Sequence, residues 1–187
     1  MDLHVTNGDT TVSLLQAAGI DGELLPWRDV LYDGPVPSGH TLETLSDVRA
    51  DFLAKQFRQT YDEIRGFMAT RDATLRKAGD FLEVVLWFEH DLYDQLQILQ
   101  VLDALATDAS VQNKISMICI GRFPGIVPFH GLGQLSPDQI AGLWPTRHSV
   151  DRSQLSLAQK GWRAFTAADP RLLNDLRDED TSALPFL

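Results

Sequence analysis

The segment Phe81–Phe88 constrains the fold most, because it is a run of eight mostly apolar residues that includes two adjacent valines. Such a run is typical of a strand whose two faces are both buried. Three ionisable residues follow it directly: Glu89, His90 and Asp91. The apolar stripe of residues 92–106 then predicts a well-buried helix. We therefore expect a strand that runs straight into a helix, as in a parallel α/β sheet.

The remaining periodicity predicts the same alternation of strands and helices. We expect strands at residues 3–6, 23–27 and 114–121, and helices from Asp9 or Thr10 to Gly19, over 46–57, and from a capping box at Thr60–Glu63 to Gly79. Pro26 favours an edge position for the second strand. This order predicts right-handed crossovers and an open, mostly parallel, Rossmann-like sheet flanked by helices.

The C-terminal third of the chain has a different pattern. A loop rich in Gly and Pro follows Gly121, and Ser136–Gln139 and Ser156–Gln159 are capping boxes that predict helices. A length of 187 residues fits one domain. We therefore expect an α/β sheet domain over residues 1–125 and a helical extension over 126–187 that forms a cap on the same domain.

The charge of the chain narrows the classes of partner. The net charge is −10 and the isoelectric point is about 4.8, so the surface repels phosphate backbones and anionic lipid. Nucleic acid is therefore disfavoured as a partner of this domain alone, while a small molecule remains compatible with it. The composition leaves the oligomeric state open.

The location of the protein is inferred from three features. No apolar stretch reaches the ~20 residues that span a bilayer, so we expect no membrane partner. The N-terminus lacks the basic and apolar regions of a signal peptide. Cys119 is the only cysteine, which fits a reducing compartment, and its apolar surroundings indicate a buried side chain rather than a catalytic thiolate. We expect a cytoplasmic protein.

Polar side chains follow three of the expected strands. They are Asn7, Gly8 and Asp9 after the first strand, Arg28 and Asp29 after the second, and Glu89, His90, Asp91, Asp94 and Gln95 after the third. The carboxyl ends of parallel strands meet at one edge of a sheet, where ligands bind at a switch in strand order. We therefore expect these clusters to converge on one ligand site, with Trp27 and Trp87 as an apolar wall.

An enzyme site of this kind would use His90, Asp94 and Glu89 as its catalytic residues. His90 would act as the acid or base, and Asp94, four residues later, would orient it. Arg28 would bind an anionic group of the ligand or pair with Glu89. This arrangement predicts hydrolysis or group transfer on a polar metabolite.

The other polar residues would bind the ligand or a metal ion. Gly8 would let the backbone approach an anion at a helix N-terminus, although Asn7–Asp9 is equally a turn and a helix cap. A divalent cofactor, Mg²⁺ or Mn²⁺, would be held by Asp9, Asp29 and Glu89. Asn7, Arg28 and Gln95 would complete the ligand site.

Two other interpretations remain open at this point. The polar strand ends would serve a non-catalytic sensor or interaction domain equally well, with binding of an effector but no turnover. Alternatively, Glu89, His90 and Asp91 form a purely structural hydrogen-bond network, with Asp91 as the cap of the next helix. The sequence does not decide whether the chain is an enzyme.

Four segments together carry a resemblance to a known family. They are Leu3–Asp9, Leu25–Leu31, Asp33–Val36 and Leu86–Leu96, and the Trp-Phe-Glu-His-Asp stretch with the Tyr-Asp-Gln that follows is the specific part. The chain resembles, over residues 1–105, the bacterial family catalogued as domain of unknown function 1835. The resemblance implies a bacterial cytosolic protein but no established activity, substrate or cofactor.

The resemblance also bears on the alternative function. Members of that family often continue, past a Leu-Pro-Phe-Leu segment, into a region similar to a winged-helix DNA-binding module. This chain stops at Leu184–Leu187. The resemblance therefore implies, as the alternative, a sensor or interaction domain of a regulatory protein whose C-terminal DNA-binding module is absent here.

Overall fold

A computed structural model describes residues 1–187 and places five strands in one sheet. The strands are β1 (Leu3–Thr6), β2 (Glu23–Pro26), β3 (Val84–Glu89), β4 (Ile115–Ile120) and β5 (His148–Ser149). Their order is β2-β1-β3-β4-β5, and all neighbours are parallel except β5, which pairs antiparallel with β4. The predicted open, mostly parallel, Rossmann-like α/β sheet is confirmed, and β2 lies at an edge, as Pro26 indicates.

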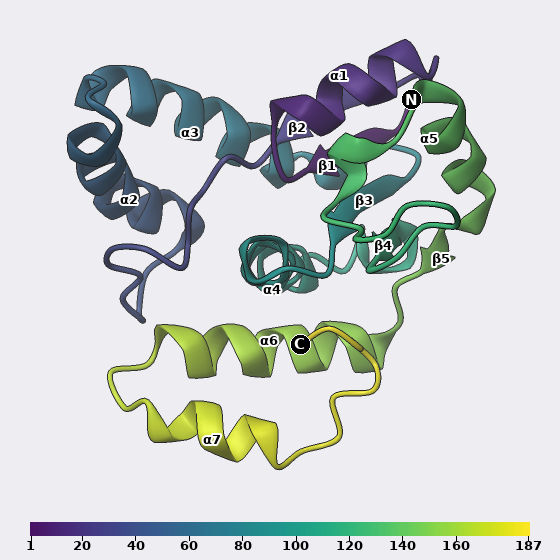
Figure 1. Ribbon diagram of the computed structural model, residues 1–187. Coiled ribbons are helices and arrows are strands. Elements are labelled where there is room, and N and C mark those ends of the chain that lie inside the picture. Colours follow the sequence, from purple (N-terminus) through teal and green to yellow (C-terminus); the bar gives the residue numbers. More distant parts are fainter.

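The chain has seven α-helices, and helices lie on both faces of the sheet (Figure 1). They are α1 (Asp9–Ala17), α2 (Leu42–Phe57), α3 (Tyr61–Arg76), α4 (Leu92–Ala106), α5 (Pro137–Leu143), α6 (Arg152–Thr166) and α7 (Arg171–Arg177). Helices α1 and α5 lie on one face and α4 on the other, and α6 packs on the outer side of α4. None of these helices has the length and apolarity needed to cross a membrane.

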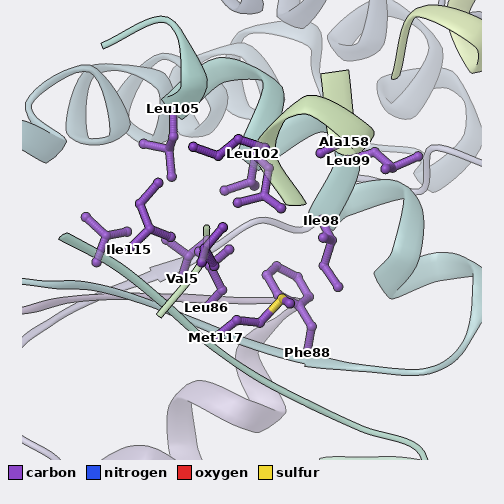
Figure 2. Close-up of a cluster of buried hydrophobic side chains, with 14 of the residues drawn as sticks. Val5, Leu86, Phe88, Ile98, Leu99, Leu102, Leu105, Ile115, Met117 and Ala158 are labelled. Atoms are coloured by element: carbon purple, nitrogen blue, oxygen red, sulfur yellow. The ribbon is translucent and has the colours of Figure 1, made fainter. Parts of the chain in front are cut away.

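The continuous apolar run of β3 is buried on both faces of the sheet. All six of its residues are buried, and alternate side chains enter different cores. Figure 2 shows the core on the α4 side, where Leu86 and Phe88 lie near Ile98 and other side chains of α4. On the opposite face Trp87 packs in a second cluster with Leu15 of α1 and Ile140 of α5. The strand is therefore central, as its sequence predicts.

The strand order changes direction at β1, and this determines where a ligand site can form. The chain steps from β1 to β2 on one side and then returns to place β3 on the other side of β1. In the β1–β3 register Thr6 lies beside Trp87, so the residues that follow these two strands are neighbours. Such a switch point is the usual site of ligand binding in open parallel sheets.

The C-terminal third differs from the predicted helical extension, because it also supplies a strand to the sheet. His148 pairs with Met117 of β4, and the Val150 N–H donates to the Ile115 carbonyl at 2.9 Å. The expected boundary at residue 125 therefore divides one sheet. A two-residue strand has no periodicity that a sequence pattern could reveal.

Candidate functional site

The switch point brings Asn7, Glu89 and Asp94 together, as expected. The Asn7 Nδ2 amide donates to both carboxylate oxygens of Asp94, at 3.0 and 3.3 Å. The Glu89 backbone N–H donates to Asp94 Oδ2 at 2.6 Å, and the Thr11 hydroxyl donates to Asn7 Oδ1 at 2.9 Å. Asp94 thus connects the ends of β1 and β3 from the first turn of α4.

The start of α4 sets the direction of the Asp94 side chain. Asp91 is the N-cap of the helix, and its Oδ1 accepts from the Asp94 N–H at 2.9 Å. Because the helix begins at Leu92, the side chain of Asp94 points back toward the strand ends. The prediction that Asp91 caps this helix is confirmed.

Burial changes the protonation of both inner carboxyl groups. Burial raises the pKa of Asp94 to about 8, and the neighbouring Glu89 charge raises it further against the donation from Asn7. Burial also raises the pKa of Glu89, which the Leu132 N–H partly opposes. Asp94 therefore holds a proton near neutral pH unless a cation replaces that proton.

The Glu89 carboxylate is enclosed by a loop far away in the sequence. The Leu132 N–H donates to Glu89 Oε1 at 2.5 Å. Gly131 has φ +154°, and a Cβ atom there would overlap the Glu89 carboxylate. Only glycine fits this close approach. Sequence reasoning did not identify Gly131 and Leu132, and the sole local signal was the Gly- and Pro-rich composition of the loop.

Three carboxylates form the group that is best suited to hold a metal ion. One oxygen from each of Glu89, Asp91 and Asp94 lies within 4.8 Å of the other two. Oxygens that share one Mg²⁺ at about 2.1 Å lie about 3–4 Å apart, so these three would have to move closer together to hold that ion. Of the predicted ligands Asp9, Asp29 and Glu89, only Glu89 belongs to this group.

Asp29 does not line the strand-end site. Its side chain is fully buried, and Arg49 donates to its Oδ1 oxygen from Nε at 3.0 Å. The Arg71 guanidinium lies 4.0 Å from its Oδ2 oxygen, and Gln97 Nε2 donates to its backbone carbonyl at 2.9 Å. Asp29 is thus enclosed by two arginines from the α2–α3 hairpin, whose positions no local pattern indicated.

His90 forms no hydrogen bond with Asp94, so the predicted acid–base pair is not assembled in this structure. The residue precedes the helix, and the carboxylate of Asp94 faces Asn7 and the Glu89 N–H. The His90 ring packs near Phe129 and Phe186, with centroid separations of 6.2 and 6.1 Å. Its Nδ1 atom is buried and has no hydrogen-bond partner.

Arg28 and Asp9 form an ion pair beside the site rather than joining the carboxylates. Arg28 Nε donates to Asp9 Oδ2 at 2.8 Å, and the guanidinium lies 4.4 Å from the centroid of the Phe67 ring. The expected pairing of Arg28 with Glu89 does not occur. Both residues line a cavity of about 460 Å³ between the strand ends and the α2–α3 hairpin, together with Leu53, Phe57, Gln59, Glu63, Ile64, Phe67 and Met68.

The backbone connects this cavity to the carboxylate cluster. The Arg28 N–H donates to the Asn7 carbonyl at 3.1 Å, and Arg28 adopts φ +55°, which is uncommon for a residue other than glycine. Gly8 is the N-cap of α1, has an extended φ of −173°, and has open space where a Cβ would lie. Gly8 is therefore accessible, but its conformation does not require glycine.

Gln95 and Cys119 support the cluster from behind. Gln95 Nε2 donates to the Glu89 carbonyl at 2.6 Å, and the Cys119 thiol lies 3.4 Å from the same oxygen. Burial raises the pKa of the Cys119 thiol to about 12. The thiol therefore stays protonated, which supports the interpretation of this cysteine as structural.

The two tryptophans do not form a wall of the site. Both are fully buried, and each donates its indole N–H inside a different core. Trp27 donates to Gln100 Oε1 at 2.7 Å, whereas Trp87 donates to His4 Nδ1 at 3.1 Å. The predicted apolar wall is not formed, because Trp27 and Trp87 are enclosed in the two cores of the protein.

Comparison of the chain with protein-family models, with curated proteins and with solved structures found no match. The resemblance to the family catalogued as domain of unknown function 1835 stays a prediction. Functional inference for this chain therefore depends on the geometry at the strand ends.

Proposed function

We propose that this chain is a small-molecule-binding α/β domain that holds a divalent metal ion, Mg²⁺ or Mn²⁺, at the carboxyl ends of β1 and β3. The observation that carries the proposal is the convergence of Glu89, Asp91 and Asp94, one oxygen of each within 4.8 Å of the others, at the switch point of the sheet. Hard oxygen ligands of this kind suit these ions.

The electrostatics of the cluster support a cation. Asp94 is fully buried and Glu89 is nearly so, and no Lys or Arg forms an ion pair with either carboxylate. Two adjacent buried carboxylates without a cation must share protons. A divalent ion would take the place of those protons, and Asn7 would keep Asp94 oriented through its amide.

The neighbouring cavity supports an anionic ligand. Arg28 offers a guanidinium that is now occupied by the exposed Asp9, and a ligand carboxylate or phosphate would compete for it. Phe57 and Phe67 supply apolar surface for the rest of the ligand. Metal-assisted hydrolysis or group transfer on an anionic metabolite is the activity that we assign to this site, with no part for His90.

A non-catalytic sensor is the second candidate, and a separate observation favours it. The loop at Gly131–Leu132 encloses Glu89, and Phe186 near the C-terminus packs against His90. A ligand that moved either contact would change the C-terminal segment without any turnover. The two candidates share a binding site and differ only in whether the ligand is converted.

Metal-dependent unfolding tests the proposal. At a metal concentration of 100 times the dissociation constant, binding adds about 2.7 kcal/mol, which corresponds to about 5–10 °C in melting temperature at this chain length. We expect Mg²⁺ or Mn²⁺ to produce this shift in the wild type, and EDTA to reverse it. Asp91→Asn should lose most of the shift, because asparagine still caps a helix but carries no charge.

The matched control is Asp62→Asn, which removes an exposed carboxylate from the first turn of α3. This variant should keep the full metal response. Equal shifts in Asp91→Asn and in the wild type would disprove the metal site. Turnover of phosphorylated metabolites with the metal present would then distinguish the enzyme from the sensor.

A further inference from the structure

A second cavity, of about 430 Å³, lies away from the strand ends among α2, α3, α4 and α6. Its size falls within the range of small-molecule sites in proteins. Its lining combines leucines of α2, α3 and α4, the indole ring of Trp162 from α6, and several acidic side chains. None of the residues of the strand-end site takes part in it.

Asp103 is the unpaired charge of this cavity. It lies on α4, is partly buried, and forms neither a hydrogen bond nor an ion pair in the structure. Burial raises the pKa of this carboxyl, and only the more distant Arg163 opposes the shift. A partly buried carboxylate without a partner is costly, and a bound cation would offset that cost.

The other charged side chains of the lining have partners in the protein, including Asp108, whose Oδ1 accepts from the Ser110 hydroxyl at 2.7 Å. Asp72 binds Arg71 at 2.8 Å, and Glu43 binds Arg76, which is the sole lysine or arginine among the lining residues. The cavity therefore has a negative balance in a chain whose net charge is −10. Such a field concentrates cationic ligands.

Gln100 presents an unmet hydrogen-bond donor to the same cavity. Its side chain is only 3% exposed, and its Oε1 accepts from the indole N–H of Trp27 at 2.7 Å. An indole N–H can only donate, so the amide oxygen must face Trp27. The amide nitrogen is then the free end of the side chain, and it has no hydrogen-bond partner in the protein. Because Gln100 lines the cavity, an acceptor on a bound ligand can pair with this amide nitrogen.

We propose that this cavity binds an organic amine whose ammonium group pairs with Asp103 and whose hydrogen-bond acceptor meets the amide nitrogen of Gln100. The apolar body of the ligand lies against Trp162 and the leucines of the lining, Leu42, Leu45, Leu75 and Leu105. Aromatic rings such as the indole of Trp162 also attract ammonium groups through their π faces. The site is independent of the metal site proposed above.

Four small probes separate the contributions of charge and acceptor. Phenylalaninamide has an ammonium, a carbonyl and a phenyl ring; 2-phenylethylamine lacks the carbonyl; 3-phenylpropanamide lacks the ammonium; and phenylacetate carries the opposite charge. Binding is measured by titration of the full chain, followed through the indole N–H resonance of Trp162, which is assigned with Trp162→Phe. Ligands of this size bind in the millimolar range, so the titration extends to about 5 mM.

The expected order of affinity is phenylalaninamide first and 2-phenylethylamine second, with the neutral amide and phenylacetate at least about tenfold weaker, since a charge-assisted contact is worth that factor. Asp103→Asn should lose this preference for the amine and keep the wild-type circular dichroism, with a melting temperature no lower than that of the wild type. Asp103→Glu should keep the preference, and Asp175→Asn, at an exposed position on α7, should bind as the wild type does.

Three results would overturn the proposal. The first is that no probe shifts the Trp162 resonance up to about 5 mM, and the second is that the amine binds no more tightly than its neutral counterpart. The third is that folded Asp103→Asn binds 2-phenylethylamine as tightly as the wild type. If Asp103→Asn fails to fold, the comparison of charged and neutral probes on the wild type still decides the matter.

Discussion

Asp29 and Asp94 are both fully buried carboxylates, but the protein compensates their charges in different ways. Asp29 is paired with Arg49, whose guanidinium is itself fully buried. The Asp94 carboxylate accepts only from the amide of Asn7 and the backbone N–H of Glu89, and a second carboxylate, that of Glu89, lies near it. A buried carboxylate that is paired with an arginine, such as Asp29, belongs to the fold. A buried carboxylate without a cationic partner, such as Asp94, needs a bound proton or a cation and is typical of a functional site.

The pH dependence of stability should reveal this incompleteness. The pKa of Asp94 is about 8 in the folded protein and 3.8 as the ordinary value, so the folded state favours the protonated form. The resulting stabilisation is fully present below about pH 4 and is lost as the pH rises toward 8. In the absence of metal, we expect the unfolding free energy of the wild type to fall by this contribution as the pH rises. The contribution should be missing from Asp94→Asn.

Urea unfolding between pH 5 and pH 8.5 measures the difference between the two proteins. The variant should fold, because the Thr11 hydroxyl can accept as well as donate and so allows the Asn7 amide to flip toward Asn at position 94. His4, whose pKa is lowered by burial, contributes equally to both proteins and cancels in the difference. Parallel stability curves for the two proteins would contradict the raised pKa of Asp94.

At the scale of elements, the N-termini of the helices show how well capping boxes in the sequence predict where a helix begins. The capping boxes at Thr60–Glu63 and Ser136–Gln139 are present with both reciprocal hydrogen bonds. The box predicted at Ser156–Gln159 is wrong, because α6 already begins at Arg152, with Asp151 as its N-cap and Gln154 as the third residue. Asp151–Gln154 and Ser156–Gln159 both satisfy the capping-box motif. The helix begins at the earlier one, because its apolar face then packs on α4 over a longer stretch.

This difference predicts unequal effects of two alanine substitutions in α6. Asp151→Ala removes a side chain that accepts from the backbone N–H groups of Ser153 and Gln154 and should cost about 1 kcal/mol of unfolding free energy. Ser156→Ala, inside the helix and exposed, should change stability by less than about 0.5 kcal/mol. Chemical unfolding of both variants makes the comparison, and a larger loss from Ser156→Ala would place the helix start at the later box.

At the scale of the whole molecule, the C-terminal third adds a strand to the α/β sheet as well as the helices that were predicted for it. β5 covers the edge of β4, and α6 packs across α4, where Gly161 permits contact with Leu99. A Cβ at Gly161 would lie 3.0 Å from the Leu99 side chain, so the two helices are closely packed. Residues 126–187 and the rest of the chain thus share one core.

A shared core predicts a single cooperative unfolding transition. Far-ultraviolet circular dichroism reports on all helices, while tryptophan fluorescence reports on Trp27 and Trp87 in the sheet and on Trp144 and Trp162 beyond it. We expect both signals to have the same midpoint in urea, as two-state unfolding requires. Separate midpoints would contradict a single cooperative unit made of residues 126–187 and the rest of the chain.

Local sequence patterns were sufficient for the framework of this protein. The apolar run of β3, the caps of α3, α4 and α5, and the position of β2 at an edge all follow from side chains within a few residues of each other. The alternation of strands with helices then predicts a mostly parallel sheet, and with it the edge at which Asn7, Glu89 and Asp94 meet. These features depend on hydrogen bonding and burial that neighbouring residues decide.

Only the tertiary structure decided where the polar side chains after each strand point. Asp29 turned toward Arg49, His90 toward Phe129 and Phe186, and Glu89 toward a backbone N–H 43 residues away. Each direction is determined by a partner that is distant in sequence, and a charged side chain near a strand end follows whichever partner offsets its loss of hydration. The sequence therefore determined which residues reach this edge, and long-range packing determined which of them share a site.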